Sequence, residues 1–543
     1  MIKLAKYLKP FALAILVSFV LLFGQAMADL NLPNYMSDIV NVGIQQSGIE
    51  TAAPEAISAK GMTVMQYFMT DSEKKDMNRY YKLVSKDGTG AQHDEDVSRY
   101  PLLKTEDIYV LSGADGETME RLGKTFGEST WTMINVMKKL AAQSGKSVSM
   151  SGTDLKEVDF SKLYAMEPVL KQIPAGVYDQ ARKDAISGTE SLFAQSAVTM
   201  TKSFYKELGM DIARMQRDYI INKGLWMLFV ALLGGVATVL VAFFSARVSA
   251  GVARDLRRDV FGKVECFSNT EFDRYSTASL ITRTTNDVTQ VQMLIMMGIR
   301  MICYAPILGI GGVFMALRKS FSMGWIIALA CVVLCGLILV VFSVAMPKFK
   351  IVQKLIDRLN LVARENLNGL MVIRAFGTQK FEEERFDRSN EDLTRTTLFI
   401  SRIMIFMMPI IILIMNLVTL LIVWVGAHRI ADSTMQVGDM MAFMQYAIQI
   451  IMSFLMIAVM FIMVPRAAVS ANRIAEVIET EPSIEDPEHP KAFRQDKTGF
   501  VTFRNVSFRY HGADEDVLHD VSFTAKPGQT TAFIGSTGSG KTT

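Results

Sequence analysis

The chain has 543 residues, of which 50% are hydrophobic and 20% are charged, a balance too apolar for an ordinary soluble enzyme of that size. The net charge is only +3, and the basic residues lie beside apolar segments rather than in a stripe, which argues against a nucleic-acid partner. The four cysteines show no disulfide framework and no zinc-site spacing. These features indicate an integral membrane protein.

Six apolar runs are long enough to cross a hydrocarbon core about 30 Å thick. They lie at residues 11–29, 219–246, 293–317, 321–346, 403–428 and 438–464. Lys3, Lys6 and Lys9 precede the first run, and basic residues between Arg247 and Lys263 follow the second. Because the cytoplasmic flanks of spans are rich in lysine and arginine, we predict a multi-pass plasma-membrane protein. Both termini are expected in the cytoplasm, with the segment between the first two runs outside.

The first run also fits a signal peptide. A basic start and an apolar stretch lead to Ala26-Met27-Ala28, which is similar to a cleavage site. Cleavage would remove one span and leave every later segment on the same side of the membrane.

The outside segment, residues 50–217, is expected to form a small, mostly helical extracellular domain. Helix-compatible stretches lie at 133–142 and 189–212. We find no catalytic or metal-ligand pattern in this segment. His93 and the three acidic residues after it read as a solvated loop.

Two stretches between runs, residues 247–292 and 347–402, are charged, helix-forming and too long for simple turns. We expect each to extend the spans into the cytoplasm as helices that bend back through a short turn. The segment Glu479–Pro490 contains prolines and acidic residues that cannot continue a helix, so it separates the spans from a further domain. In that domain, Gly499–Tyr510 alternates like a half-buried strand, and Val517–Ala525 follows as a second strand.

The last nine residues have the pattern G-x-x-x-x-G-K-[ST] and follow a strand-like stretch at Thr531–Ile534. This pattern is typical of a phosphate-binding loop, in which glycines let backbone N–H groups point at phosphate oxygens. The predicted phosphate-binding residues are Gly535, Ser536, Thr537, Gly538, Ser539, Gly540, Lys541, Thr542 and Thr543. Lys541 is expected on the β- and γ-phosphates of ATP or GTP, and the Thr542 hydroxyl on Mg²⁺.

Four further segments resemble the ATP-binding cassette (ABC) exporter family. Ser276–Val288 and Glu365–Phe376 are similar to its two cytoplasmic loops, and Val437–Phe443 is similar to the entry into its sixth span. Phe503–Tyr510 is similar to the opening of its nucleotide-binding domain. With the six spans and the phosphate loop, the resemblance covers nearly the whole chain except the outside segment.

The resemblance implies a mainly α membrane protein, one half-transporter of the multidrug or lipid exporter type. Its six-helix exporter transmembrane domain would have long cytoplasmic helical extensions, an extracellular insertion between spans 1 and 2, and the β-rich start of a P-loop nucleotide-binding domain. The expected domains are the first span with its flanks at 1–49, the extracellular domain at 50–217, spans 2 to 6 with two coupling loops at 218–470, a linker at 471–498 and the start of the cassette domain at 499–543.

The resemblance also implies roles for single residues. Tyr510 corresponds to the aromatic residue that stacks on adenine, whereas an ordinary strand aromatic is the alternative. The bends near Asn269–Tyr275 and Leu361–Asn368 correspond to coupling elements, with solvated hairpins as the alternative. The residues expected to carry coupling are Phe272, Arg274, Leu361 and Asn368.

The family's second acidic phosphate-site motif, its signature and its switch histidine would follow Thr543. The catalytic residues are therefore unknown. We expect the 543-residue chain to lack hydrolytic activity, whereas the longer protein implied by the resemblance is an ATPase and translocase.

These expectations predict half of an ATP-driven exporter that moves hydrophobic or amphipathic compounds, drug-like, lipid or peptide, outward by alternating access. A second half-transporter, identical or different, and membrane lipid are the expected partners. The alternative is a sensor whose extracellular domain detects a peptide or lipid-directed agent and signals to a partner. A channel with a regulatory nucleotide domain is disfavoured, because no filter-like loop is evident.

Three uncharged polar residues in the spans, Asn416, Gln445 and Gln449, are candidates for a substrate cavity. Polar groups inside hydrocarbon tend to face the interior of a helix bundle. Hydrogen bonding between helices is the alternative use.

Overall fold

The computed structural model describes residues 2–143, 160–186, 190–485, 489, 498–510 and 513–543. The chain divides into two compact units, one formed by Leu16–Phe244 and Gly298–Phe461, the other by Met1–Ile15, Ser245–Met297 and Ile462–Thr543. Each unit is described by itself.

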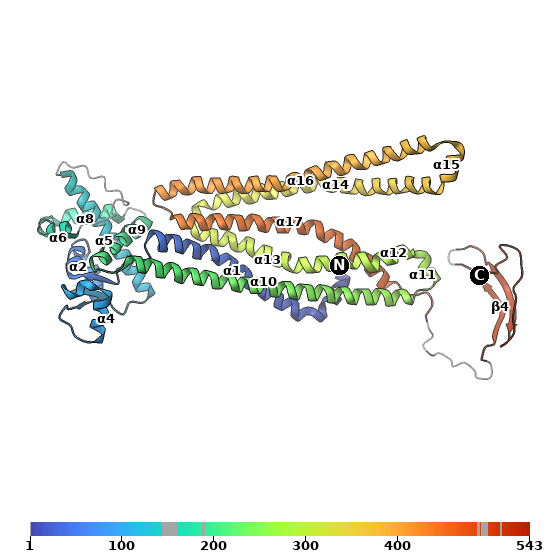
Figure 1. Cartoon of the computed structure of the whole chain (residues 1–543), viewed down its shortest axis with the longest axis horizontal. Helices are drawn as coiled ribbons and strands as arrows, with labels where there is room; N and C mark the ends of the chain where they lie inside the picture. Colours follow the sequence, from blue (N-terminus) through green and yellow to red (C-terminus); the bar gives the residue numbers. More distant parts are fainter. Residues whose placement is uncertain (1, 144–159, 187–189, 486–488, 490–497, 511–512) are drawn as a thin grey trace. The chain divides into compact units, whose positions relative to one another are not determined.

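Long helices dominate the structure (Figure 1). They are α1 (Ala12–Asp38), α10 (Ile212–Glu265), α13 (Val288–Lys319), α14 (Gly324–Asn368), α16 (Gln379–Ala431) and α17 (Val437–Glu479). Among the described residues, six helical stretches are long and apolar enough to cross a membrane, and each contains one of the expected runs. The prediction of a mainly α protein with six spans is therefore confirmed.

The larger unit holds a core to which α1, α10, α13, α14, α16 and α17 contribute, including the fully buried Leu22, Leu30, Phe443 and Tyr446. Many other large apolar side chains on these helices are exposed, among them Leu225, Trp226 and Phe229 of α10. Contiguous apolar surface on long helices is what a lipid bilayer covers.

Polar side chains tie three of these helices together. Lys319 of α13 donates to Asp439 Oδ1 of α17 at 2.9 Å and to Ser37 Oγ of α1 at 3.2 Å. Asn41, in the π-helix η2 (Ile39–Gln45), accepts from the Gly438 backbone N–H at 2.7 Å. A Cβ at Gly438 would lie 2.5 Å from Asn41 Oδ1, so this contact requires glycine.

Between η2 and α10, the described residues of the range 46–211 form a folded part, which we name the inserted domain. Its strands are β1 (Ala56–Ser58), β2 (Tyr81–Val84) and β3 (Ile108–Leu111), which form an antiparallel sheet in the order β1-β3-β2. Its helices are α2 (Ala59–Gln66), α3 (Asp71–Tyr80), α4 (Ala91–Arg99), η3 (Pro101–Lys104), α5 (Gly116–Gln143), α6 (Phe160–Ala165), α7 (Glu167–Gln172), α8 (Ala175–Ile186) and α9 (Glu190–Glu207).

Helix α5 contains the helix-compatible stretch 133–142, and α9 covers residues 190–207 of the stretch 189–212. The small sheet was not expected, because strands of three or four residues leave almost no alternating pattern. His93 lies in helix α4, not in a loop as predicted. The domain ends where α10 begins at Ile212, earlier than the expected boundary at 217.

Both expected hairpins form helices. The first passes through α11 (Asn269–Arg274), α12 (Thr277–Thr282) and the π-helix η4 (Arg283–Asp287). In the second, α14 and α16 lie side by side, and α15 (Leu370–Phe376) lies at their bend (Figure 1). A short 3₁₀ turn, η5 (Phe321–Met323), precedes α14, and a longer 3₁₀ helix, η1 (Ile2–Phe11), precedes α1. Helix α17 continues to Glu479, so the helix extends past the expected domain boundary at 470.

Two strands, β4 (Val501–Phe508) and β5 (Leu518–Ala525), pair antiparallel after α17. They match the two predicted strands, but most side chains of β4 are exposed rather than half-buried. The reason is that, within the described part of the chain, β4 has only β5 as a sheet neighbour. Thr531–Ile534 was expected as a strand and has no regular structure, since a strand requires a hydrogen-bonded partner.

Candidate functional site

The glycines of the loop at residues 535–543 are required by its backbone. Gly538 and Gly540 have φ of +85° and +83°, which side chains with a Cβ rarely adopt. A Cβ on Gly535 would lie 2.5 Å from Ser539 Oγ. Hydrogen bonds from Ser539 N to Ser536 O and from Thr543 N to Gly540 O, both 3.2 Å, close two tight turns.

Lys541 folds back over this loop. Its Nζ donates to the carbonyl oxygens of Gly535 at 2.5 Å and Ser536 at 2.7 Å. The loop carbonyls thus occupy the Lys541 ammonium, which places the positive charge of Lys541 against the loop. Thr542 is exposed.

Tyr510 lies beside the same loop. Its hydroxyl donates to Thr543 Oγ1 at 3.2 Å, and half of the residue's surface is exposed. The ring meets Phe508 edge-on with centroids 5.1 Å apart, which orients it without covering it. The structure therefore brings Tyr510 to the phosphate loop. The two bonded residues, Tyr510 and Thr543, are 33 positions apart in the sequence.

The first bend, at α11, is fixed to the chain that follows α17. Glu271 accepts hydrogen bonds from Ser268 N and Oγ at 2.7 Å and from Ser483 N at 3.2 Å. Ser268 Oγ and Ser483 Oγ are 2.7 Å apart, and Tyr275 Oη lies 3.0 Å from Thr480 Oγ1. The Ser268 hydrogen bonds, followed by those of Ser483, lower the pKa of Glu271 to about 2.

A second set of contacts holds α12 and η4 to α17. Arg283 donates to the Arg473 carbonyl at 2.7 Å and to Glu476 at 3.0 Å, and its guanidinium lies 4.8 Å from the centre of the Tyr275 ring. Ser470 donates to the buried Asp287 at 2.8 Å. We name these contacts and those of Glu271 the α11–linker junction, defined by Ser268, Glu271, Tyr275, Arg283, Asp287, Ser470, Glu476, Thr480 and Ser483.

Sequence reasoning missed this junction. Its local signal is the Ser268-x-x-Glu271 capping box, in which the two side chains satisfy each other's backbone N–H groups at the start of α11. The partners of that box lie more than two hundred residues away, as the 212-residue separation of Glu271 and Ser483 shows. Phe272 and Arg274, expected in this bend, lie in α11 and are exposed.

The second bend lies later than expected. Leu361 and Asn368 are in α14, with Asn368 as its last residue, so neither is in the turn itself. The bend is α15, which ends at Gly377 with φ +65°. Met371 and Phe376 of α15 are 79% and 78% exposed and form an apolar tip.

Residues 191–454, from α9 to within α17, match the family model described as the ABC transporter transmembrane region. This part of the chain belongs to the ABC transporter transmembrane region family. Two relatives are uncharacterized ABC transporter ATP-binding proteins. The protein from Mycobacterium tuberculosis is 36% identical over 61% of this chain and 57% of its own length, and the protein from Bacillus subtilis is 36% identical over 61% and 59%.

An ATP-dependent lipid A-core flippase from Aromatoleum aromaticum is 29% identical over 59% of this chain and 52% of its own length. The matched part of the chain thus spans less than three fifths of each of these relatives. Most of the inserted domain, up to residue 190, precedes the region matched by the family model.

Of the three polar candidates in the spans, Gln449 forms a hydrogen bond between helices. Its Nε2 donates to the Asp29 carbonyl of α1 at 3.1 Å. Asn416 and Gln445 are exposed. Asp29 was missed, although it ends the first apolar run, because its neighbours come from other helices.

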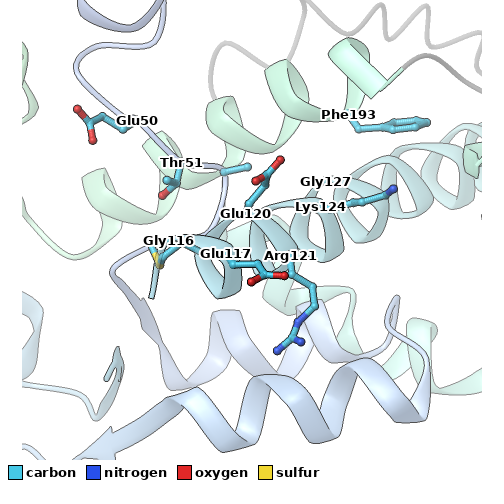
Figure 2. Close-up of a pocket in the computed structure, with 12 residues that line it drawn as sticks. Glu50, Thr51, Gly116, Glu117, Glu120, Arg121, Lys124, Gly127 and Phe193 are labelled. Atoms are coloured by element: carbon cyan, nitrogen blue, oxygen red, sulfur yellow. The ribbon is translucent and has the colours of Figure 1, made fainter. Parts of the chain in front are cut away.

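The inserted domain has an open groove of about 810 Å³. Figure 2 shows charged residues of α5 beside Glu50 and Thr51, with Phe193 of α9 at one end. The charges are of both signs, Glu117 and Glu120 beside Arg121 and Lys124. The groove can therefore accept a ligand with both acidic and basic groups.

Proposed function

We propose that this chain is half of an ATP-driven exporter, which moves lipid-like, amphipathic compounds outward across the plasma membrane by alternating access. The α11–linker junction is the observation that carries the proposal. It fastens a bend between two spans to the segment that leads to the phosphate loop, so a movement at the loop can be passed to the helices. The flippase relative supports a lipid-like substrate.

ATP with Mg²⁺ is the proposed cofactor, and the loop fits it. Lys541 and the loop backbone would hold the phosphates, Thr542 would contribute its hydroxyl to Mg²⁺, and the half-exposed ring of Tyr510 would stack on adenine. When bound, ATP supplies the phosphoanhydride bond whose cleavage drives transport. Lys541 would then give up its loop carbonyls and neutralise phosphate charge.

A second half-transporter, identical or related, is the proposed partner. The exposed apolar tip of α15, with Met371 and Phe376, suits docking against another protein surface. By the positive-inside rule, α11 and α15 would face the cytoplasm together with both termini, and the inserted domain would be extracellular.

Lys541→Ala tests the proposal in the full-length protein, reconstituted in inside-out vesicles with a fluorescent lipid analogue. We expect ATP-dependent uptake to be lost and the affinity for ATP to fall about tenfold or more, since a charge-assisted contact is removed. Lys526→Ala, an exposed lysine before the loop, is the matched control and should transport normally. Unchanged uptake with Lys541→Ala would refute the proposal.

Sensing is a second candidate, favoured by the groove of the inserted domain. A sensor would show no ATP-dependent uptake in the vesicle assay. Gly123→Trp, which fills the groove beside Ala52, would abolish the cellular response to a membrane-active peptide. An exporter that does not use the groove would transport the lipid analogue equally well with this substitution.

A further inference from the structure

An acidic side chain, Asp29 of α1, ends the apolar run 11–29 but lies inside the helix bundle, because α1 continues to Asp38. Asp38, nine residues further along the helix, pairs with Lys223 of α10 at 3.6 Å near the end of the span. At 1.5 Å per residue, Asp29 lies about 13 Å from that level, or nearly half of a hydrocarbon core of about 30 Å.

The residues that contact Asp29 from neighbouring helices indicate the same depth of Asp29 in the membrane. A Cβ on Gly234 of α10 would lie 3.8 Å from Asp29 Oδ1, and Gly234 is central in the run 219–246. Tyr304 of α13 donates its hydroxyl to Asp29 Oδ2 at 2.5 Å, and Gln449 of α17 donates to the Asp29 carbonyl. Both residues are also near the middle of their apolar runs.

Two amide oxygens beside Asp29 are buried and unpaired. Gln25 lies one helical turn before Asp29 and is 5% exposed, and its Oε1 has no hydrogen-bond partner among the described residues. Gln449 Oε1 is also buried without a partner there. Buried polar atoms are normally hydrogen-bonded, and within hydrocarbon an unpaired one is especially unfavourable.

These atoms have one chemistry in common. The Asp29 carboxylate and the amide oxygens of Gln25 and Gln449 all accept hydrogen bonds, and the carboxylate adds a negative charge. Intramembrane carboxylates normally have a cationic or polar partner. Arg300, one turn from Tyr304 on α13, makes no ion pair with Asp29 in the described structure. An ammonium group offers both N–H donors and a positive charge.

We propose that Asp29, Gln25 and Gln449 form a subsite for the primary or secondary ammonium group of an amphipathic compound. The buried apolar residues around them, Leu22 and Leu308 among them, suit the compound's hydrocarbon part. The inference rests on the proposed export function, because it names the polar group of the transported compound. Tyr304 orients the carboxylate by donating to one of its oxygens.

The test is equilibrium binding to the nucleotide-free, full-length protein in lipid nanodiscs, with empty nanodiscs as the background. Three probes share a twelve-carbon chain: dodecylammonium, dodecyltrimethylammonium, which has the charge without N–H donors, and dodecanol, which has no charge. We expect dodecylammonium to bind about tenfold more tightly than the other two, as for a hydrogen bond to a charged group.

Asp29→Asn should remove this preference, and Gln449→Met should reduce it without removing the charge. Gln445→Met, on the exposed side of the same helix, is the matched control and should keep the preference. Thermal melting of each variant checks that it is folded, and Gln449→Met keeps the test decisive if Asp29→Asn does not fold. Equal affinity of the wild type for the three probes, or an unchanged preference in Asp29→Asn, would overturn the proposal.

The result is separate from the test of export. Probe binding needs no ATP, whereas the Lys541→Ala experiment measures ATP-dependent uptake. If the wild type transports but shows no preference for dodecylammonium, only the subsite is refuted. If the wild type shows the preference but no ATP-dependent uptake, only the export function is refuted.

Discussion

Arg182 of α8 neutralises two largely buried carboxylates in the inserted domain. It donates to Glu73 and, at 2.9 Å, to Glu128, and also to the Phe68 carbonyl at 3.0 Å. The side chains of Arg182, Glu73 and Glu128 are 13%, 19% and 17% exposed. Two like charges would therefore face each other if the arginine were removed.

We predict that Arg182→Met lowers the stability of the inserted domain by about 3 kcal/mol, since it leaves buried charges without a partner. Hydrogen exchange of the α8 amides in the full-length protein measures the loss. Lys183→Met, an exposed neighbour, is the control. The prediction fails if both variants exchange at the same rate.

Glu271 gives the α11–linker junction a pH dependence of known sign. Its pKa is lowered to about 2 in the folded protein from an ordinary value of 4.5, because Ser268 and Ser483 donate to its ionised form. The stabilisation is thus present above pH 4.5 and is lost as the pH falls from there toward 2.

We therefore expect the Ser483 amide to lose protection from hydrogen exchange at pH 3 relative to pH 6, after correction for the intrinsic rate. Glu271→Gln should show the low protection already at pH 6. Glu265→Gln, an exposed acid on α10, should behave as the wild type. Equal protection of the wild type at both pH values would contradict the assignment.

Among single residues, the sequence predicts contacts between neighbours in the chain and misses contacts between residues that are far apart in it. The glycines and Lys541 of the phosphate loop are readable, because the loop is built from neighbours in the chain. Asp29 and Tyr304 are 275 residues apart, so their hydrogen bond follows only from the packing of helices. The contact between Glu271 and Ser483 was missed for the same reason.

Among the elements, α11 allows the coupling role to be tested. Phe272 and Arg274 are exposed, whereas Glu271 and Tyr275 of the same bend are committed to the α11–linker junction. Phe272→Ala should therefore leave the junction intact and remove only the surface that α11 offers to another domain.

We predict that Phe272→Ala lowers lipid-analogue uptake severalfold while ATP affinity stays within about twofold of the wild type, a change below 0.5 kcal/mol. Uptake and nucleotide binding are measured on the same vesicles. Thr277→Ala, an exposed position of α12, is the control. Uptake equal to that of the wild type would remove Phe272 from the coupling surface.

The elements themselves were predictable to different degrees. Each of the six spans is a long apolar run whose length alone is decisive. The second bend was placed too early, at Leu361–Asn368, because this stretch continues the helical pattern of α14. Helix α14 ends before Gly369, and the bend ends at Gly377, which has a left-handed backbone conformation. The stretch Thr531–Ile534 was predicted wrongly. Its composition favours a strand, but it has no regular structure, because a strand also needs a hydrogen-bonded partner strand.

At the scale of the whole molecule, the proposed topology puts the inserted domain and the phosphate loop on opposite sides of the membrane. With the four natural cysteines replaced by alanine, Lys86→Cys in the inserted domain should react with a membrane-impermeant maleimide on intact cells. Ser536→Cys should react only after permeabilisation. Both positions are exposed, so access alone decides the result. Labelling of Ser536→Cys from outside would exclude the topology.

Hydrogen bonds hold some helices of the larger unit together, and apolar contacts hold others. The two kinds of contact differ in how strongly they oppose a shift of one helix along another. Helices α1, α13 and α17 are cross-linked by the hydrogen bonds of Lys319, Asp439 and Asn41, which fix their axial register. The pair α14–α16 meets α17 through apolar side chains such as Leu334, Ile411 and Phe454. Apolar contacts lack the directional hydrogen bonds that fix an axial position, so we expect the α14–α16 hairpin to shift along α17 more readily than α1 or α13 does.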